Sequence, residues 1–175
     1  MFRPRLIVSL LLSDNALIKT KEFKDPKYIG DPINAVRIFN EKSVDELFIA
    51  DIKVSKEKKL PNFDLIKKIS QECRMPICYG GGIRSLEDIE KIINLGVEKV
   101  SICSSFLKDP NLIKMAAGKF GSQSIVVCLD VKKSRFNKNY NLCFNNGKNF
   151  SKKDLFICIQ ELESLGAGEL IINSI

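Results

Sequence analysis

Apolar positions along the chain fall into short, nearly continuous runs separated by segments with helical periodicity. Continuous β-branched runs are typical of parallel strands buried on both faces, whereas apolar residues three and four apart indicate amphipathic helices. Strands are predicted at residues 5–12, 46–51, 75–79, 99–103, 124–131 and 169–174. Helices are predicted to start near Pro32, Phe63, Leu86 and Pro110, and after Ser151 as the cap of the last helix. This alternation favours a parallel α/β fold.

Two strand-like stretches occur twice in the chain. Residues 5–12 (RLIVSLLL) resemble residues 124–131 (SIVVCLDV), and residues 45–52 resemble residues 168–175. A chain of βα units in two matched halves favours a (β/α)8 barrel over the alternative, an open doubly wound sheet. Within the first pair, Leu11 stands where the second copy has an aspartate.

A complete barrel of this kind has eight strands and typically about 250 residues, whereas this chain of 175 residues supplies six predicted strands. We therefore expect about six of the eight βα units, with residues 1–120 as the first half-barrel and residues 121–175 as the start of the second. The chain is then expected to be a fragment or a truncated reading frame. Two segments interrupt the rhythm: residues 13–30 predict a long polar loop, and residues 132–150, with the turn signal Asn146-Gly147, predict a short hairpin.

Composition narrows the possible chemistry. The formal net charge is +7, which favours phosphorylated metabolites or an acidic partner, but no nucleic-acid motif with stacking aromatics accompanies the lysines, so nucleic acid is not expected. Neither a membrane span nor a signal peptide is present in the sequence pattern, and we expect a soluble cytoplasmic protein without a membrane partner. The six cysteines contain no C-x-x-C pair and the chain has no histidine, which argues against a metal site and against a Ser-His or Cys-His nucleophile.

Polar residues and glycines follow several predicted strands, at the ends where (β/α)8 barrels carry their active sites. They are Asp51, Gly80-Gly81-Gly82, Cys103-Ser104 and Asp130. The amides of the glycine turn, with the hydroxyl of Ser104, would suit a phosphate, although such turns also use glycine for geometry alone. Asp130 is the candidate acid or base, and the competing interpretation is a carboxylate that caps the following loop.

A second charged set precedes the apolar runs of four predicted strands. Its members are Arg5, Glu46, Lys99 and Glu169. Two cations and two anions at this end could form a ring that closes the floor of the barrel. The competing interpretation is purely structural, because this face of such barrels usually serves stability.

Six short motifs jointly resemble one family. They are Gly30-Asp31-Pro32, Asp45-Glu46-Leu47, Tyr79-Gly80-Gly81-Gly82-Ile83, Gly96-Val97-Glu98-Lys99-Val100-Ser101-Ile102, Phe120-Gly121-Ser122-Gln123 and Gly166-Ala167-Gly168-Glu169. From about residue 3 to the last residue, the chain resembles the cyclase subunit of imidazole glycerol phosphate synthase. The resemblance implies a (β/α)8 barrel without a cofactor or metal, in a heterodimer with a glutaminase subunit whose ammonia passes through the barrel. It also implies a lyase reaction of histidine biosynthesis, which converts a phosphorylated substrate to imidazole glycerol phosphate and aminoimidazole carboxamide ribotide.

The resemblance assigns roles to individual residues. It implies an ammonia gate formed by Arg5, Glu46, Lys99 and Glu169, substrate or phosphate binding by Gly81, Gly82, Ser104, Lys19 and Asp51, and catalysis by Asp130. The family's other catalytic aspartate belongs at position 11, where this chain has a leucine that can neither donate nor accept a proton. Cys103 replaces the asparagine usual beside Ser104, which weakens that phosphate site.

Three further stretches more closely resemble a paralogous branch of the family. They are Leu10-Leu11-Leu12, Lys27-Tyr28-Ile29-Gly30-Asp31-Pro32 and Cys78-Tyr79. This branch belongs to bacterial surface-polysaccharide pathways, where it delivers ammonia to an amidotransferase that converts an acetamido sugar to an acetamidino sugar. Three functions therefore remain open: an ammonia-channelling subunit of that kind, a histidine-pathway cyclase, or a non-catalytic remnant that only binds a glutaminase. Leu11 weighs against the cyclase, and we expect this chain alone to be inactive.

Overall fold

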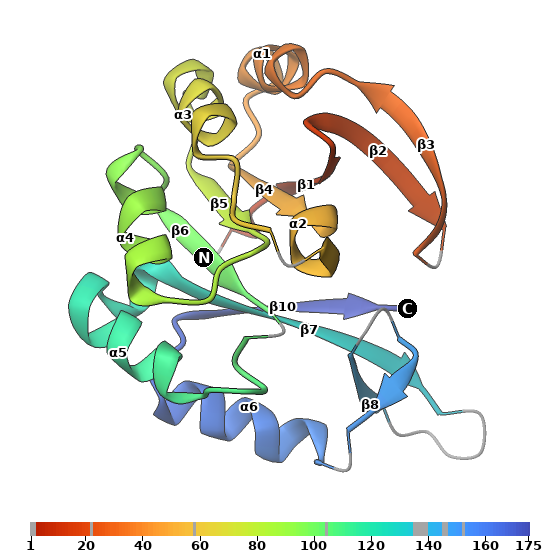
Figure 1. The fold of residues 1–175 in the computed structure, drawn as a ribbon, viewed down its shortest axis with the longest axis vertical. Coiled ribbons are helices and arrows are strands. Elements are labelled where there is room, and N and C mark those ends of the chain that lie inside the picture. The colour runs from red at the N-terminus through yellow and green to blue at the C-terminus, as the bar shows by residue number, and fades with distance from the viewer. Residues whose placement is uncertain are drawn as a thin grey trace. The chain divides into compact units, whose positions relative to one another are not determined.

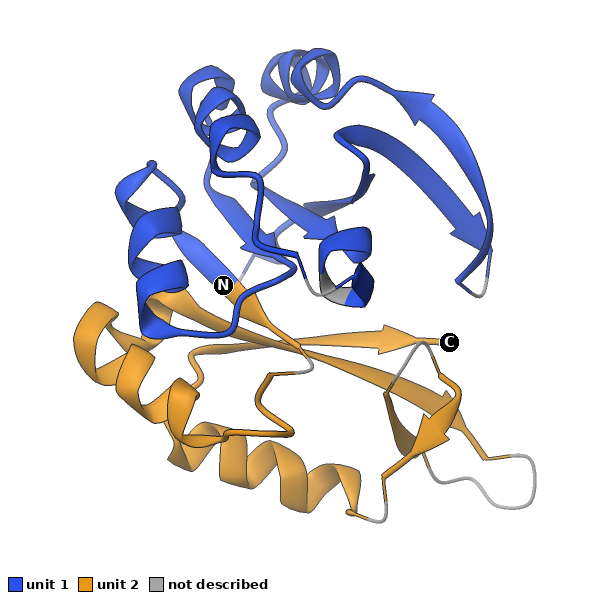
Figure 2. Cartoon of the chain, in the orientation of Figure 1, with its two compact units in different colours: residues 1–100 blue, residues 101–175 orange. Residues whose placement is uncertain are grey.

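The computed structural model describes residues 3–21, 23–57, 59–103, 105–134, 140–144, 147–151 and 153–175. Strands and helices alternate along the chain (Figure 1), and the strands joined through helices run parallel, as expected for part of a (β/α)8 barrel. The chain divides into two compact units, residues 1–100 and residues 101–175 (Figure 2).

The sheet of the first unit is built from β1 (Ile7–Ser13), β2 (Ala16–Lys21), β3 (Lys24–Gly30), β4 (Glu46–Asp51) and β5 (Ile77–Gly80). Strand β4 is parallel to β1 and β5, whereas β1, β2 and β3 form an antiparallel ladder. The prediction of a polar loop at residues 13–30 is therefore wrong. Asp14 and Asn15 both have positive φ, as a tight type I′ turn requires. Strand β3 is exposed nearly throughout, so it lacks the apolar alternation that would have revealed a strand.

Four helices of the first unit follow its strands: α1 (Pro32–Lys42), α2 (Ile52–Glu57), α3 (Phe63–Glu72) and α4 (Leu86–Asn94). Asp31 caps α1 by accepting a hydrogen bond from the Asn34 amide at 3.0 Å. The predicted capping box of α4 is confirmed, because Ser85 and Asp88 each accept a hydrogen bond from the other's backbone amide.

The core of the first unit follows the period of two that a strand imposes. Leu10 and Leu12 on β1 are 7% and 1% exposed, whereas Leu11 between them is only half-buried. Alternate residues therefore lie on opposite faces of the sheet, and one face is packed more tightly than the other. The apolar side chains of the helices complete this packed layer, among them Val36, Ile66, Ile69, Ile89 and Ile92.

The second unit contains the end of β6 (Lys99–Ile102), which starts in the first unit. It continues with α5 (Asn111–Phe120), a 3₁₀ turn (Ser122–Ser124), β7 (Ile125–Lys133), β8 (Tyr140–Phe144), β9 (Asn149–Phe150), α6 (Leu155–Ser164) and β10 (Glu169–Ser174). Strand β7 is parallel to β10 and antiparallel to β8, and β8 is antiparallel to β9. The predicted hairpin at residues 132–150 is confirmed, although Asn146 of its turn signal lies outside the described residues.

One predicted helix cap is wrong. Helix α6 is capped by Asp154, whose carboxylate accepts hydrogen bonds from the Phe156 and Ile157 amides. Ser151 instead accepts one from the Lys153 amide in the preceding turn. Asp and Ser are both good caps, so the sequence alone does not separate them.

Within the described ranges, no helix combines the length and the apolar character needed to cross a membrane.

Candidate functional site

The carboxyl ends of β4 and β5 bring Asp51 and the glycine turn of the first unit together. Asp51 is 5% exposed, and its Oδ1 accepts a hydrogen bond from the Val54 amide at 3.2 Å, so it caps α2. Burial raises the pKa of Asp51, while the hydrogen bonds from the Val54 and Lys53 amides act in the opposite direction. The carboxylate thus has a local structural partner, and its predicted contact with substrate stays a prediction.

Gly81 and Gly82 are held where no side chain fits. Gly81 has φ +128° and a Cβ there would lie 2.3 Å from the Asp51 carbonyl oxygen. Gly82 has φ +71° and its Cβ would lie 2.3 Å from Val54 Cγ1. Local geometry therefore accounts for both glycines, and their predicted phosphate binding stays a prediction.

Two amides at the start of α4 are already engaged. The Arg84 and Ser85 amides both donate to the Asp88 carboxylate, at 3.0 and 3.1 Å. A phosphate at this turn would have to be bound without these two amides. Ser104, the predicted hydroxyl partner of this site, lies outside the described residues.

The hydroxyl of Tyr79, just before the glycine turn, is a feature that the sequence did not reveal. Tyr79 is 1% exposed, and its hydroxyl has no hydrogen-bond partner among the described residues. Burial and the nearby Asp51 charge both raise its pKa. Only the three-dimensional structure shows that this hydroxyl lacks a partner in the described part of the chain.

Leu11 and Lys19 belong to the same unit. Leu11 pairs with Ala50 on β4 and with Ile18 on β2, so position 11 lies among apolar neighbours. Lys19 is exposed on β2 and pairs with Lys27 on β3.

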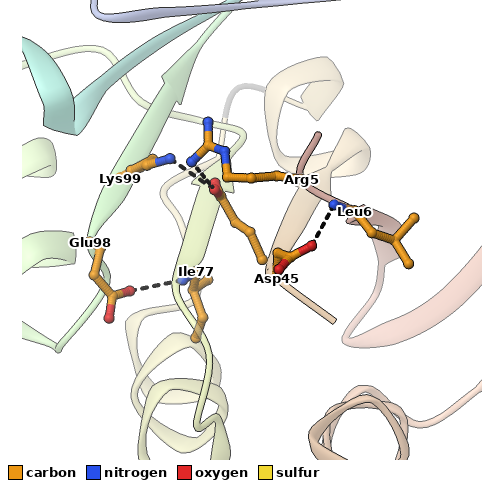
Figure 3. A network of polar contacts seen from close by, with 7 residues as sticks. Arg5, Leu6, Asp45, Ile77, Glu98 and Lys99 are labelled. Carbon is orange, nitrogen blue, oxygen red and sulfur yellow. Dashed lines mark hydrogen bonds and ion pairs between the residues drawn. The ribbon is translucent and has the colours of Figure 1, made fainter. Parts of the chain in front are cut away.

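Three of the four predicted gate residues meet at the amino ends of the strands. Glu46 is 2% exposed, and its Oε2 accepts from Arg5 Nη1 at 3.2 Å and from Lys99 Nζ at 2.8 Å. Figure 3 shows both cations converging on this carboxylate from separate segments. Glu169 lies in the second unit, at the first residue of β10, so its membership of the ring stays a prediction.

Two neighbouring acids hold the edges of this cluster. Asp45 Oδ2 accepts from the Leu6 amide at 2.7 Å, and Glu98 Oε2 accepts from the Ile77 amide at 2.8 Å (Figure 3). Each acid binds a backbone amide at or next to the first residue of a strand, where the sheet ladder begins. The Arg5–Glu46–Lys99 cluster is therefore anchored to the backbone on both sides.

Asp130, the predicted catalytic residue, lies on β7 of the second unit. Its Oδ1 accepts a hydrogen bond from Asn173 Nδ2 at 2.7 Å, and Asn173 is the residue that pairs with it on β10. Burial raises the pKa of Asp130, and the Asn173 hydrogen bond partly offsets that shift. Asn173 was not predicted as a site residue. The repeat could have revealed it, because Asn173 occupies the position that Ala50 holds in the first copy.

Cysteines border Asp130. The neighbouring Cys128 thiol and, to a smaller extent, the Asp130 charge raise the pKa of the Cys103 thiol. Cys143 pairs with Asp130 across β7 and β8. All six cysteines are free thiols. The described part of the chain contains no cluster of three acidic, cysteine or histidine residues placed to bind a metal.

The second unit also contains a cavity of about 240 Å³, lined mainly by the loop before α5 and by α6. Its lining includes Phe106, Leu107, Cys158 and Leu162, with Lys153 and Glu161 at its polar side. None of the predicted site residues lines it.

The predicted repeat is confirmed by strand register. In the first unit Ile7 pairs with Glu46 and Leu11 with Ala50. In the second unit Val126 pairs with Glu169 and Asp130 with Asn173. The first strand of the second pair thus lies 119 residues after the first strand of the first pair, and the second strand lies 123 residues after its counterpart. Within the strands, the two copies correspond position by position.

Comparison with known proteins agrees with this architecture. The model of the histidine biosynthesis protein family matches residues 5–175. A Pseudomonas aeruginosa protein, provisionally named imidazole glycerol phosphate synthase subunit hisF2, is 51% identical over 175 residues, which are 100% of this chain and 69% of the relative. A Leptospira borgpetersenii protein, provisionally named as subunit HisF, is 49% identical over the same shares of both chains. The Campylobacter concisus subunit HisF is 39% identical over 99% of this chain and 68% of its own length. The chain therefore belongs to the histidine biosynthesis protein family, as a relative of the HisF subunit of imidazole glycerol phosphate synthase.

Proposed function

We propose that this chain transfers ammonia from a glutaminase subunit to an acceptor reaction other than imidazole ring closure. The observation that carries the proposal is the Arg5–Glu46–Lys99 cluster around a buried carboxylate, in a chain that has Leu11 where the resemblance implies a catalytic aspartate. The proposed assembly is a heterodimer with the glutaminase. The proposed acceptor is an acetamido sugar of surface polysaccharide, amidinated by a third protein.

Burying charged side chains is an energetically unfavourable way to hold a fold together. Removing Glu46 and Lys99 from water costs several kcal/mol per ion, whereas Arg5 stays half-exposed. A well-packed apolar pair of similar volume is often at least as stable. A functional role for the separation of these side chains would explain why a charged cluster is present at this position. Ammonia is small and neutral, so it would pass the Arg5–Glu46–Lys99 cluster only when the side chains separate. When the side chains are in contact, the cluster would exclude bulk water.

The proposal gives the remaining site residues their roles. Glu169 would complete the gate, and residues 1–120 and 121–175 would belong to the first and second half-barrels. Gly81, Gly82, Ser104, Lys19 and Asp51 would line the end of the barrel where an acceptor binds. Asp130, hydrogen-bonded by Asn173, would remain as a single carboxylate.

A histidine-pathway cyclase is the second candidate function, and the names of the relatives favour it. Paired acid–base catalysis needs two proton-transferring groups, and Leu11 among apolar neighbours cannot supply one. A non-catalytic remnant is the third candidate, and it predicts no ammonia transfer at all.

The test uses Arg5→Gln in the full-length protein, reconstituted with the glutaminase and amidating partner of the same organism. Arg5 is the best gate residue to change, because its side chain is 51% exposed and Glu46 keeps Lys99 at 2.8 Å. Arg37→Gln is the matched control, since it removes another exposed arginine that is paired with a carboxylate, that of Glu72.

We expect Arg5→Gln to lower product formation from glutamine by about tenfold, which corresponds to about 1.4 kcal/mol, and to leave product formation from added ammonium unchanged. Arg37→Gln should change neither rate. An equal fall of both rates, or a change confined to the melting temperature, would make the cluster structural. Absence of any amidinated product from the wild-type complex would favour the remnant.

A further inference from the structure

The β2–β3 hairpin carries four lysines in cross-strand register. Lys19 pairs with Lys27, and Lys21 pairs with Lys24. All four side chains are exposed. Directly paired residues lie on the same face of a ribbon, and Lys19 and Lys21, which are two apart on β2, share that face. A register shift between the two pairs leaves Lys24 and Lys27 three apart on β3. Because each of these two lysines pairs with a β2 lysine, the four side chains form one lysine face.

This lysine face is electrostatically unfavourable by itself. Like charges directly opposite each other on neighbouring strands destabilise the pairing, and here two such pairs follow one another. Within the described residues, no salt bridge involves any of the four lysines. A hairpin that tolerates this repulsion gains stability when an anion lies between the pairs.

The spacing indicates the size of that anion. Two residues along a strand span roughly 7 Å, and directly opposite residues lie about 5 Å apart. One phosphate can neutralise one cross-strand pair, whereas two linked phosphates reach both pairs at once. We propose that the lysine face binds the diphosphate group of a small-molecule ligand.

The position of the hairpin supports a small ligand. Strand β2 pairs with the last residues of β1, with Leu11 opposite Ile18 and Ser13 opposite Ala16. The hairpin therefore extends from the carboxyl end of β1, and ligands of (β/α)8 barrels bind at this end of the strands. The proposal extends the predicted role of Lys19 to Lys21, Lys24 and Lys27. It does not depend on ammonia transfer, because binding needs neither glutaminase nor turnover.

The experiment measures binding of inorganic pyrophosphate to the chain by calorimetry, without divalent cations and at constant ionic strength, with phosphate and sulfate as comparison anions. The test variant is Lys21→Gln/Lys24→Gln, which removes the outer lysine pair. The control is Lys67→Gln/Lys68→Gln, which removes two exposed lysines of α3 and changes the net charge equally. A Lys21→Arg/Lys24→Arg variant keeps the charge.

We expect pyrophosphate to bind more tightly than phosphate or sulfate. The test variant should weaken pyrophosphate binding at least about tenfold, since it removes two charge-assisted contacts. The control and the arginine variant should retain it. Without ligand, the test variant should melt no lower than the wild type, because a repulsive pair has been removed.

Equal affinity for the three anions, or an equal loss in the α3 control, would mean non-specific attraction to a basic protein and would overturn the proposal. A lower melting temperature of the ligand-free test variant would assign the lysines to folding instead. Binding of an acidic protein with no response to pyrophosphate would also overturn it.

Discussion

The two units of the chain carry the same strand pairing around different chemistry. Position 11 of the first unit is a leucine paired with Ala50, and the corresponding position of the second is Asp130, hydrogen-bonded by Asn173. At the opposite ends of the strands, the first unit has Glu46, 2% exposed, and the second has the half-buried Glu169. The register is the same although these polar residues differ.

This contrast separates what the fold requires from what a reaction requires. Strand register depends on backbone hydrogen bonds and on the buried alternate residues, such as Leu10 and Leu12 in the first unit and Leu129 and Val131 in the second. Residues 11 and 130 lie on the other face, where a carboxylate and a leucine are both compatible with the pairing. The side chain at this position can therefore differ between the two copies without disturbing the sheet.

The largest expected effect comes from making the first unit like the second. In the full-length protein, Leu11→Asp should raise the rate of imidazole glycerol phosphate formation by at least about 10²-fold, because it restores a second proton-transferring group. Leu11→Asn is the control, with a similar shape but no proton to transfer, and it should stay inactive. Growth of a cyclase-deficient strain on the unchanged Leu11 protein would contradict the assignment of this residue.

The next effect concerns the buried carboxylate of the first unit. Lys99→Met should lower the free energy of unfolding by about 2 kcal/mol, because Glu46 stays buried with Arg5 as its remaining partner in the first unit. Lys114→Met, at an exposed lysine of α5, should have little effect. Chemical denaturation measures both. Glu169→Gln should lower the free energy of unfolding by less than Lys99→Met does. The reverse order would mean that Glu169 of the second unit contributes more to stability than the Glu46–Lys99 pair.

A smaller effect, of opposite sign, follows from Tyr79. Tyr79→Phe removes a buried hydroxyl without a partner among the described residues, so it should stabilise the chain by about 1 kcal/mol. Tyr140→Phe, at a tyrosine that is 49% exposed, should be neutral. A loss of stability in Tyr79→Phe would mean that the hydroxyl has a partner in solution.

The smallest effect comes from removing the charge at position 130 of the second unit, since the corresponding Leu11 of the first unit is uncharged. Burial raises the pKa of Asp130, so this carboxyl binds more protons when folded than when unfolded. The free energy of unfolding should then fall as pH rises above about 4, the ordinary value for aspartate. Asp130→Asn keeps an oxygen for Asn173 and should be more stable than the wild type at pH 7, with a smaller difference at pH 4. Glu163→Gln, at an exposed residue of α6, is the control.

Prediction from sequence succeeded where one physical signal dominated. Buried parallel strands gave continuous apolar runs, and the Ser85–Asp88 capping box gave a local hydrogen-bond pattern. Arg5, Glu46 and Lys99 were predicted together, as three of a set of four, because they precede the apolar runs of strands whose amino ends lie together. The membership of Glu169 stays a prediction. The repeat was found because paired strands must keep matching apolar positions.

Prediction failed where a strand is exposed and lacks an apolar pattern, or where two nearby residues are equally good helix caps. Strand β3 carries charged and polar residues on both faces, and the turn at Asp14-Asn15 that joins β1 to β2 resembles any polar loop. The caps Ser151 and Asp154 compete within four residues, and only the geometry of α6 decides between them. The Asn173–Asp130 hydrogen bond depends on side-chain positions that follow from β7–β10 pairing.

The register of the two copies has a consequence for how such chains change in length. The offset between copies is 119 residues at the first strand and 123 at the second, since Ile7 and Glu46 correspond to Val126 and Glu169. The four additional residues of the second copy are absorbed between its paired strands, where β8, β9 and α6 lie. The segment between paired strands can therefore differ in length by four residues while the strand register stays the same. A change of that size in the β2–β3 hairpin should accordingly leave the β1–β4 pairing unaltered.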